Sequence, residues 1–286
     1  MPLHGAIDKP VHVRPTAVAG RFYPGDPETL KRDLARYLEQ ATTPEDIVLS
    51  DPSRPLRAII APHAGYIYSA PIAATAYRFV AEMKDQISRV VLIGPAHYVP
   101  FTGLAGSSAS AFMTPLCPVP VDVETTRCLA DAGLIQIHDG AHAPEHALEV
   151  HLPFLVQTLC PKPKTRFACF SILPLLFGDV GYEATAKVLS PLIDDPHTLI
   201  VVSSDLSHYH DYKTARAIDR ETAKAIVSRR PEALTPDQAC GCTAIRALLV
   251  LAKARDLEVT LVDLRNSGDT AGPHDRVVGY GAFIVR

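Results

Sequence analysis

Three short, almost wholly apolar runs mark the chain between residues 58 and 202. They are residues 58–61 (AIIA), 90–93 (VVLI) and 199–202 (LIVV). Strands without a polar face are typical of the centre of a parallel sheet, where helices cover both sides. The pattern therefore predicts three central strands.

Segments with helical spacing of their apolar residues alternate with these runs. The first begins at Asp26, a good N-cap, and Pro27, which suits the first helical position, and continues through Leu30 and Leu34. Further helices are predicted at 69–83, 122–132 with Asp122 as its N-cap, 145–159, 181–194, 212–229 and 243–255, and closing strands at 257–264 and 277–285. This alternation predicts an α/β fold with a largely parallel central sheet flanked by helices.

The chain shows no internal repeat, low-complexity tract or flexible linker that would divide it, so we expect a single domain. Residues 1–20 carry three prolines and little periodicity, which predicts a surface arm leading into the first helix. We assign residues 1–13 to an N-terminal arm and residues 14–286 to the domain.

Composition narrows the class of protein. With 47% hydrophobic and 21% charged residues, the chain has the composition of a globular protein and not of a disordered one. The net charge is -3 and no Lys/Arg cluster is present, so nucleic acid is not an expected partner. No apolar run approaches the roughly 18 residues that span a bilayer, and the first residues lack the apolar core of a signal peptide. We expect no membrane association and a cytoplasmic location.

Six cysteines are too dilute in 286 residues for a disulfide scaffold, and we expect most of them to be reduced, small buried side chains. Cys240 and Cys242 precede an apolar helical segment, and a thiol at a helix N-terminus favours the metal-binding thiolate. Residues two apart point in different directions in a strand or a helix, so only one of the pair should face a given site. For an isolated cysteine, an inert buried role is the alternative.

Residues capable of chemistry follow each apolar run directly. His63 follows the first run, His97 the second, and Asp205 and His208 the third. Because the carboxyl ends of parallel strands line the ligand crevice, these side chains should converge at one edge of the sheet.

Each pair of these residues allows two interpretations. His63 and His97 arrive on separate strands, as metal ligands often do, but loop histidines can also simply bond to backbone carbonyls. Asp205 and His208, three residues apart, can meet across one turn, where the carboxylate would orient an imidazole that transfers protons. The alternative is a helix cap beside a surface histidine.

The segment 145–153 (EHALEVHLP) places two acids and two histidines at the start of a predicted helix. Its histidines stand five residues apart, which does not match the i and i+4 pair of a metalloprotease helix. We expect Glu145 and His146 to lie behind the metal ligands or to face the substrate. The chain has neither the Gly-x-Ser-x-Gly elbow of serine hydrolases nor the Gly-x-Gly-x-x-Gly phosphate fingerprint.

Six segments together resemble the Memo family, in order and spacing, from residue 14 to the end of the chain. They are 19–23 (AGRFY), 61–66 (APHAGY), 93–97 (IGPAH), 145–153, 203–208 (SSDLSH) and 240–241 (CG). Members of the family are similar in fold to the LigB-type class III extradiol dioxygenases. The resemblance implies a metal site at His63, His97 and Cys240, catalytic roles for His208 and Asp205, and a substrate pocket that includes Phe22 and Tyr68.

The resemblance also implies an activity. In the related dioxygenases two histidines and one glutamate bind Fe(II), whereas here Cys240 matches the third ligand position. Since a thiolate changes the softness and redox potential of a metal, we expect Fe(II) first, Cu as a competitor and Zn last. The expected function is that of a dioxygenase-like oxidoreductase with a small-molecule substrate, an aromatic one among the candidates.

Two other functions compete with it. One is a phosphopeptide-binding module, to which animal members of the family have been linked. Phe22 replaces the Trp of the animal protein, and the sequence suggests no Arg fork for a phosphate in the pocket. The other is a zinc hydrolase with His208 or Glu145 as its base. Prokaryotic members are often encoded beside an AMMECR-type protein and a radical SAM enzyme (the AmmeMemoRadiSam system), which implies a functional link to both.

Overall fold

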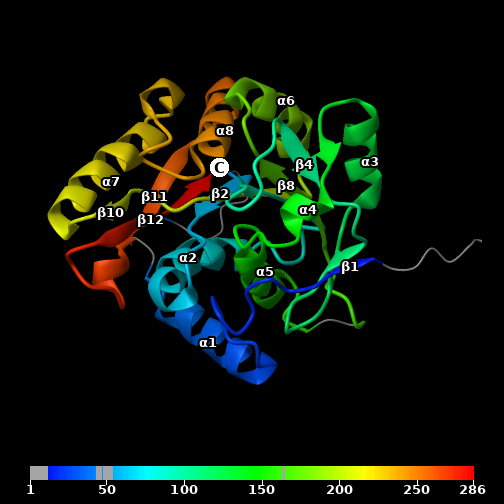
Figure 1. The fold of residues 1–286 in the computed structure, drawn as a ribbon, viewed down its shortest axis with the longest axis horizontal. Coiled ribbons are helices and arrows are strands. Elements are labelled where there is room, and N and C mark those ends of the chain that lie inside the picture. Colours follow the sequence, from blue (N-terminus) through cyan, green and yellow to red (C-terminus); the bar gives the residue numbers. More distant parts are fainter. Residues whose placement is uncertain (1–11, 43–46, 48–53, 163–164) are drawn as a thin grey trace, which may run out of the picture.

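Four parallel strands form the centre of the main sheet (Figure 1). In the computed structural model, which describes residues 12–42, 47, 54–162 and 165–286, they lie in the order β2 (Ala58–Ala61), β9 (Thr198–Ser203), β3 (Arg89–Pro95) and β8 (Ser171–Phe177). All three expected central strands are confirmed. Because the four strands run in one direction, the loops after β2, β3 and β9 leave from the same edge.

Antiparallel strands extend this centre on both sides, so the sheet is mixed, and the expectation of a largely parallel sheet holds only for its middle. On the β2 side, β12 (Val277–Val285) pairs with β2 and in turn with β10 (His208–His210) and β11 (Val259–Asn266). On the other side, β4 (Leu104–Gly106) pairs with β8 and β7 (Gln136–Ile137) with β4. A separate small sheet joins β1 (Val13–Arg14), β5 (Ala111–Phe112) and β6 (Val119–Pro120).

Helices cover both faces of the main sheet, and the whole forms one α/β domain (Figure 1). One face packs against α1 (Pro27–Gln40), α2 (Tyr66–Ala81) and α5 (Leu152–Leu159), and the other against α3 (Val123–Asp131), α6 (Tyr182–Ile193), α7 (Tyr212–Val227) and α8 (Cys242–Ala254). The short helices are α4 (Asp139–His142), η1 (Glu149–His151), η2 (Pro231–Ala233) and η3 (Ser267–Asp269). None of the helices in the described ranges has the length and apolar character needed to cross a membrane.

The apolar runs are explained by this layering. Ile59 belongs to the core on the α2 side of the sheet and Ile60 to the core on the α8 side, and both are fully buried. Successive residues of a strand point to opposite faces, so a strand covered on both sides must be apolar at every position.

The predicted helices form, with one correction. Asp26 and Asp122 cap α1 and α3 as expected, each accepting a hydrogen bond from a backbone N–H three residues on. The helix predicted at 145–159 is wrong in its first part: α5 begins only at Leu152, after the short η1 helix. Residues 145–148 are not helical, because the Glu145 carboxylate accepts backbone N–H bonds from His97, His146 and Ala147.

Strand β8 was not predicted from the sequence. Its sequence is as apolar as the other central strands, but it contains Pro174, which normally argues against a central strand because it lacks an N–H. Pro174 is tolerated because β8 pairs along its full length only with β3, while β4 reaches only Leu176 and Phe177 on the other side.

Residues 1–11 of the expected arm lie outside the described residues, and the described residues up to 20 are not a free surface segment. Arg14 lies in β1 and Val18 is fully buried. The Arg14 guanidinium forms a buried ion pair with Glu149, with 2.6 Å between Nη1 and Oε2. Glu149 also accepts hydrogen bonds from the backbone N–H of Ala17 and Val18 and from the Tyr23 hydroxyl. A single buried carboxylate thus anchors residues 14–23 to the domain.

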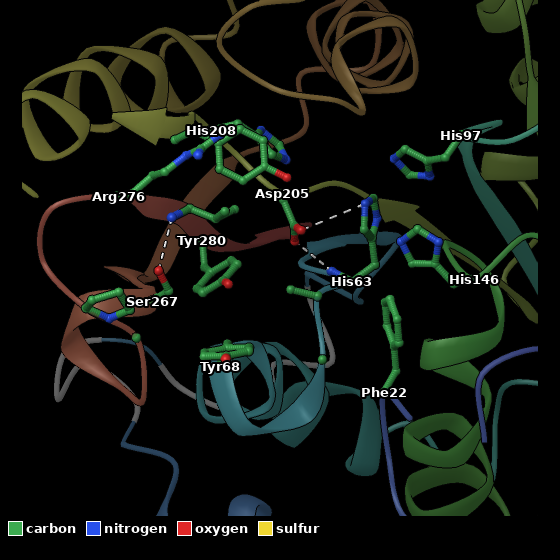
Figure 2. Close-up of a pocket in the computed structure, with 16 residues that line it drawn as sticks. Phe22, His63, Tyr68, His97, His146, Asp205, His208, Ser267, Arg276 and Tyr280 are labelled. Atoms are coloured by element: carbon green, nitrogen blue, oxygen red, sulfur yellow. Dashed lines mark hydrogen bonds and ion pairs between the residues drawn. The ribbon is translucent and has the colours of Figure 1, made fainter. Parts of the chain in front are cut away.

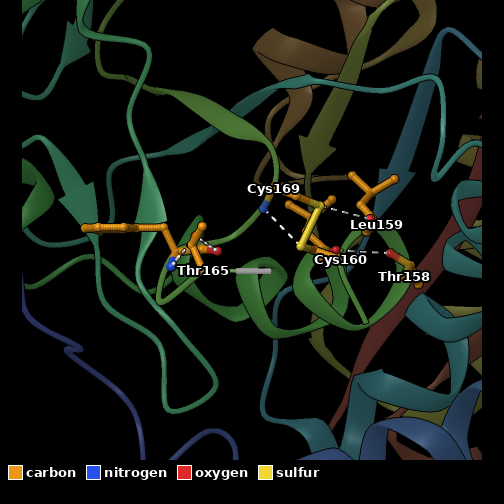
Figure 3. Close-up of a disulfide and its surroundings, with 7 residues drawn as sticks. Thr158, Leu159, Cys160, Thr165 and Cys169 are labelled. Atoms are coloured by element: carbon orange, nitrogen blue, oxygen red, sulfur yellow. Dashed lines mark hydrogen bonds between the residues drawn. A yellow bond between two sulfur atoms is a disulfide. The ribbon is translucent and has the colours of Figure 1, made fainter. Parts of the chain in front are cut away.

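Two cysteines also depart from expectation. Cys160, at the end of α5, and Cys169, just before β8, form a disulfide (Figure 3). Their Cα atoms lie 5.7 Å apart, within the normal range for a disulfide. Cys117, Cys128, Cys240 and Cys242 are free.

Candidate metal and ligand site

A cavity of about 460 Å³ lies at the edge of the sheet where β2, β3 and β9 end (Figure 2). The loops after these strands bring His63, His97 and Asp205 to its wall. The full lining comprises Phe22, His63, Ala64, Gly65, Tyr68, His97, His146, Asp205, His208, Tyr209, Ser267, Gly272, Pro273, Arg276, Val278 and Tyr280.

Three histidines gather at one end of the cavity. One ring nitrogen from each of His63, His97 and His146 lies within 4.8 Å of the other two. The rings of His97 and His146 stack with centroids 4.7 Å apart, and His63 meets both edge-on. Among the described residues, no other group of three or more metal-ligand side chains lies so close together.

Glu145 sets the orientation of His97. Its carboxylate accepts the backbone N–H of His97 at 2.5 Å and contacts Nδ1 of the ring at 2.9 Å. Burial acts to raise the pKa of Glu145, but the hydrogen bonds and charge interaction with His97 outweigh it and lower the pKa below its usual value. The ionised carboxylate holds Nδ1 as the protonated nitrogen, which leaves Nε2 of His97 as the nitrogen with a free lone pair.

His146 is held less tightly. Burial lowers the pKa of its imidazole to about 4, so the ring is neutral at pH 7. Nδ1 lies 3.2 Å from a Glu145 oxygen but has no hydrogen-bond partner in the described structure. A buried, neutral imidazole nitrogen without a partner beside two other histidines fits a metal ligand.

His63 is almost completely buried, and burial holds its pKa well below the usual value. Its backbone N–H donates to Asp205 at 2.8 Å, and Nδ1 lies 2.6 Å from the hydroxyl of Ser203. Nε2 lies 3.9 Å from the Asp205 carboxylate and 3.3 Å from the sulfur of Cys240. His63 is therefore fixed on one side and meets Asp205 and Cys240 on the other.

Asp205 contacts His63 and not His208. No hydrogen bond or ion pair joins Asp205 to His208 in the described structure, so the pairing across one turn, one of the two alternatives for these residues, does not form. The reason is local: the carboxylate is occupied by the backbone N–H groups of His63 and Ala64, and His208 already begins strand β10. Both side chains line the cavity, and burial raises the pKa of Asp205 to about 7.

Cys240 lies on the Nε2 side of His63, but it neither lines the cavity nor belongs to the histidine cluster. Its sulfur accepts the backbone N–H of Asp205 at 3.2 Å, and burial raises the pKa of its thiol to about 12. Gly241 makes this close approach feasible, because a Cβ there would lie 2.4 Å from Cβ of Ser204. Cys242 points instead into the apolar core on the α8 side, so the two cysteines separate as expected.

Of the expected pocket residues, Phe22, Tyr68 and His146 line the cavity. Glu145 is not part of the lining and contacts Nδ1 of His97 instead. The Phe22 ring packs 4.8 Å from that of His146.

The opposite end of the cavity, which Figure 2 shows around Arg276 and Ser267, was not predicted from the sequence. The Arg276 guanidinium lies 4.6 Å from the centre of the Tyr209 ring, a cation–π contact, and Tyr280 also lines this end. The expectation of a pocket without arginine is therefore wrong. β12 runs antiparallel to β2, so its start lies at the edge where β2 ends, and Arg276 directly precedes it.

Almost the whole chain is similar in sequence to one family of proteins. The model of the family described as "Memo-like protein" matches residues 14–284. A MEMO1 family protein of Methanosarcina mazei is 34% identical over 291 residues, covering 96% of this chain and all of that protein. MEMO1 family proteins of Aquifex aeolicus (34% identical, 96% of this chain and 99% of that protein) and Methanopyrus kandleri (32% identical, 96% and 99%) are similar over almost their whole length.

Proposed function

This chain belongs to the Memo family, and we propose that it is a metal-dependent, dioxygenase-like oxidoreductase that acts on a small anionic, aromatic molecule bound in the cavity. The observation that carries the proposal is the cluster of His63, His97 and His146. All three are positioned to offer a ring nitrogen, and burial favours the neutral form of His63 and His146, as metal binding requires.

The donor set suits Fe, Cu and Zn, and we propose Fe(II) first. Imidazole nitrogens bind all three metals, and histidines beside a carboxylate such as that of Asp205 are the usual ligands of non-haem Fe(II). The soft sulfur of Cys240 suits Cu and Zn, which we place second and third. Cys240 contacts Nε2 of His63, so it is placed to become a fourth donor or to tune His63. When bound, such a metal supplies open coordination positions and electron transfer.

The protein side chains supply binding and proton transfer. His208 lines the cavity, and burial lowers the pKa of its imidazole, so it is neutral near pH 7 and can take a proton from a bound hydroxyl. Asp205 holds the backbone of His63 in place.

The opposite end of the cavity supports the class of substrate. Arg276 forms no ion pair with an acidic side chain in the described structure, so its charge is available to a ligand carboxylate or phosphate. Tyr68, Tyr280 and Phe22 offer aromatic surface between Arg276 and the histidines (Figure 2).

Metal analysis of protein purified without oxygen tests the metal site. Titration of metal-free protein with Fe(II), Cu and Zn should give one tight site per chain for Fe(II), and His97→Ala should weaken it at least about tenfold. Oxygen uptake is then measured with a panel of catechols with and without a carboxylate. Iron binding with uptake of the acidic catechols supports the oxidoreductase. Retention of zinc alone, with hydrolysis of an ester or amide, would replace it by a zinc hydrolase.

Arg276 also favours a second candidate, a module that binds a phosphopeptide without catalysis. Phosphotyrosine binding that is lost in Arg276→Gln, in protein that takes up no metal, would support the module. Binding of neither metal nor phosphotyrosine would contradict both candidates.

A further inference from the structure

A hydrogen-bonded series of buried polar side chains extends from Nδ1 of His63, away from the cavity. The Tyr77 hydroxyl lies 2.9 Å from Nδ1 of His151, and Nε2 of His151 lies 3.0 Å from the Ser203 hydroxyl. Ser203 in turn lies 2.6 Å from Nδ1 of His63. Tyr77, His151 and Ser203 are almost completely buried, and none of them lines the cavity.

Only one arrangement of protons satisfies all the hydrogen bonds of this series of side chains. Ser203 Oγ also lies 2.6 Å from the backbone carbonyl oxygen of Ala147, which can only accept a hydrogen bond. The single hydroxyl proton of Ser203 must therefore go to Ala147, since two acceptors would otherwise face each other at 2.6 Å. Ser203 then accepts from both histidines.

It follows that both neighbouring imidazoles have a defined tautomer. His63 carries its proton on Nδ1 and leaves the lone pair of Nε2 facing the site. His151 carries its proton on Nε2 and accepts the Tyr77 hydroxyl at Nδ1. Burial lowers the pKa of His151 to about 3, so this ring is neutral at neutral pH and can accept from Tyr77.

We infer that Ser203 is a positioning residue that fixes the metal-binding tautomer of His63, and that Tyr77 and His151 fix Ser203 from behind. The inference rests on the proposed function only in so far as Nε2 of His63 binds a metal. A histidine in the opposite tautomer would present an N–H to the metal and could not bind it through Nε2.

The tautomers can be read directly in metal-free protein by NMR with ¹⁵N-labelled histidine. We expect His63 of the wild type to be protonated on Nδ1 and His151 on Nε2. In Ser203→Ala, His63 should lose this preference, and Fe(II) affinity should fall by about 10- to 100-fold. Thr222→Val, which removes a buried hydroxyl that bonds within its own helix, is the matched control and should change neither.

Each result separates the inference from the proposed function. A wild-type His63 protonated on Nε2 would overturn the inference whether or not metal binds, and so would a Ser203→Ala protein with unchanged tautomers and affinity. Absence of metal binding with the expected tautomers would contradict only the metal site. If Ser203→Ala does not fold, Tyr77→Phe removes one hydroxyl and should unlock the tautomer of His151. An unchanged His151 in that variant would contradict the role of Tyr77.

Discussion

Glu145 holds His97 at two points, through the backbone N–H at 2.5 Å and through Nδ1 of the ring at 2.9 Å. The same carboxylate accepts the backbone N–H groups of His146 and Ala147, each at 2.9 Å. One side chain therefore ties the loop after β3 to the segment before α5. Because His97 and His146 come from these two segments, their relative position depends on Glu145.

Replacing Glu145 by Gln should weaken metal binding without removing a candidate ligand. The amide keeps the size of the side chain but turns an NH₂ group toward groups that are themselves donors. We expect Fe(II) affinity to fall about 10- to 100-fold in anaerobic calorimetry. Glu124→Gln, the same change at an exposed position, is the control. Equal affinity of the two variants would show that Glu145 does not position the site.

The two cysteines near α8 should differ in their effect on metal binding. Cys240→Ser removes the sulfur beside Nε2 of His63 and should lower affinity for Fe(II) or Cu, whereas Cys242→Ser alters only the apolar core. Metal titration of both folded variants makes the comparison. Equal metal retention in the two variants would argue against any role of Cys240 at the metal. Loss of metal only in Cys242→Ser would show that the sulfur of Cys242, and not that of Cys240, matters for metal binding.

The ion pair between Arg14 and Glu149 should be essential to stability. Glu149→Gln leaves the buried guanidinium without its countercharge, so we expect a loss of about 3–5 kcal/mol in the free energy of unfolding in urea. Glu221→Gln, which breaks an exposed pair with Lys224, should cost less than about 1 kcal/mol. Similar losses in the two variants would refute the anchoring role.

Buried His142 should make the protein less stable in acid. Burial lowers its pKa to about 4 from an ordinary 6.5, so its contribution is fully present above pH 6.5. It is lost as the pH falls from 6.5 to about 4, because the unfolded chain takes up the proton first. His142→Gln keeps a donor for the Ala105 carbonyl but does not titrate.

The stability of wild type relative to His142→Gln should therefore fall by up to about 3 kcal/mol between pH 7 and pH 4. Urea unfolding of both proteins at several pH values measures the difference. A difference that stays constant over this range would contradict the assignment.

The disulfide between Cys160 and Cys169 predicts a thiol count. Denatured protein without reductant should show four reactive thiols, those of Cys117, Cys128, Cys240 and Cys242, and reduction should expose two more. Replacing both Cys160 and Cys169 by Ser should cost about 2–3 kcal/mol, as expected for a loop of this length. Six thiols without reductant would show that the bond is absent in solution.

The sequence by itself determined those features that depend on neighbouring residues or on burial. The cap residues Asp26 and Asp122 act within one helical turn, so their helices could be placed from the sequence. The apolar runs at 58–61 and 199–202 predicted central strands because a strand covered on both faces has no polar position. The order of strands then placed His63, His97 and Asp205 at one edge.

Only the tertiary structure decided which side chains meet at that edge. His146 joins His63 and His97, since the segment around Glu145 folds back over the loop after β3. Cys240 contacts Nε2 of His63 but stays outside this cluster. Arg276 reaches the cavity only because β12 pairs antiparallel with β2. Arg14 and Glu149 lie 135 residues apart and the sequence holds no trace of their pairing. Such contacts depend on how whole elements pack, and that packing is set by the sum of many weak interactions across the core and not by any local pattern.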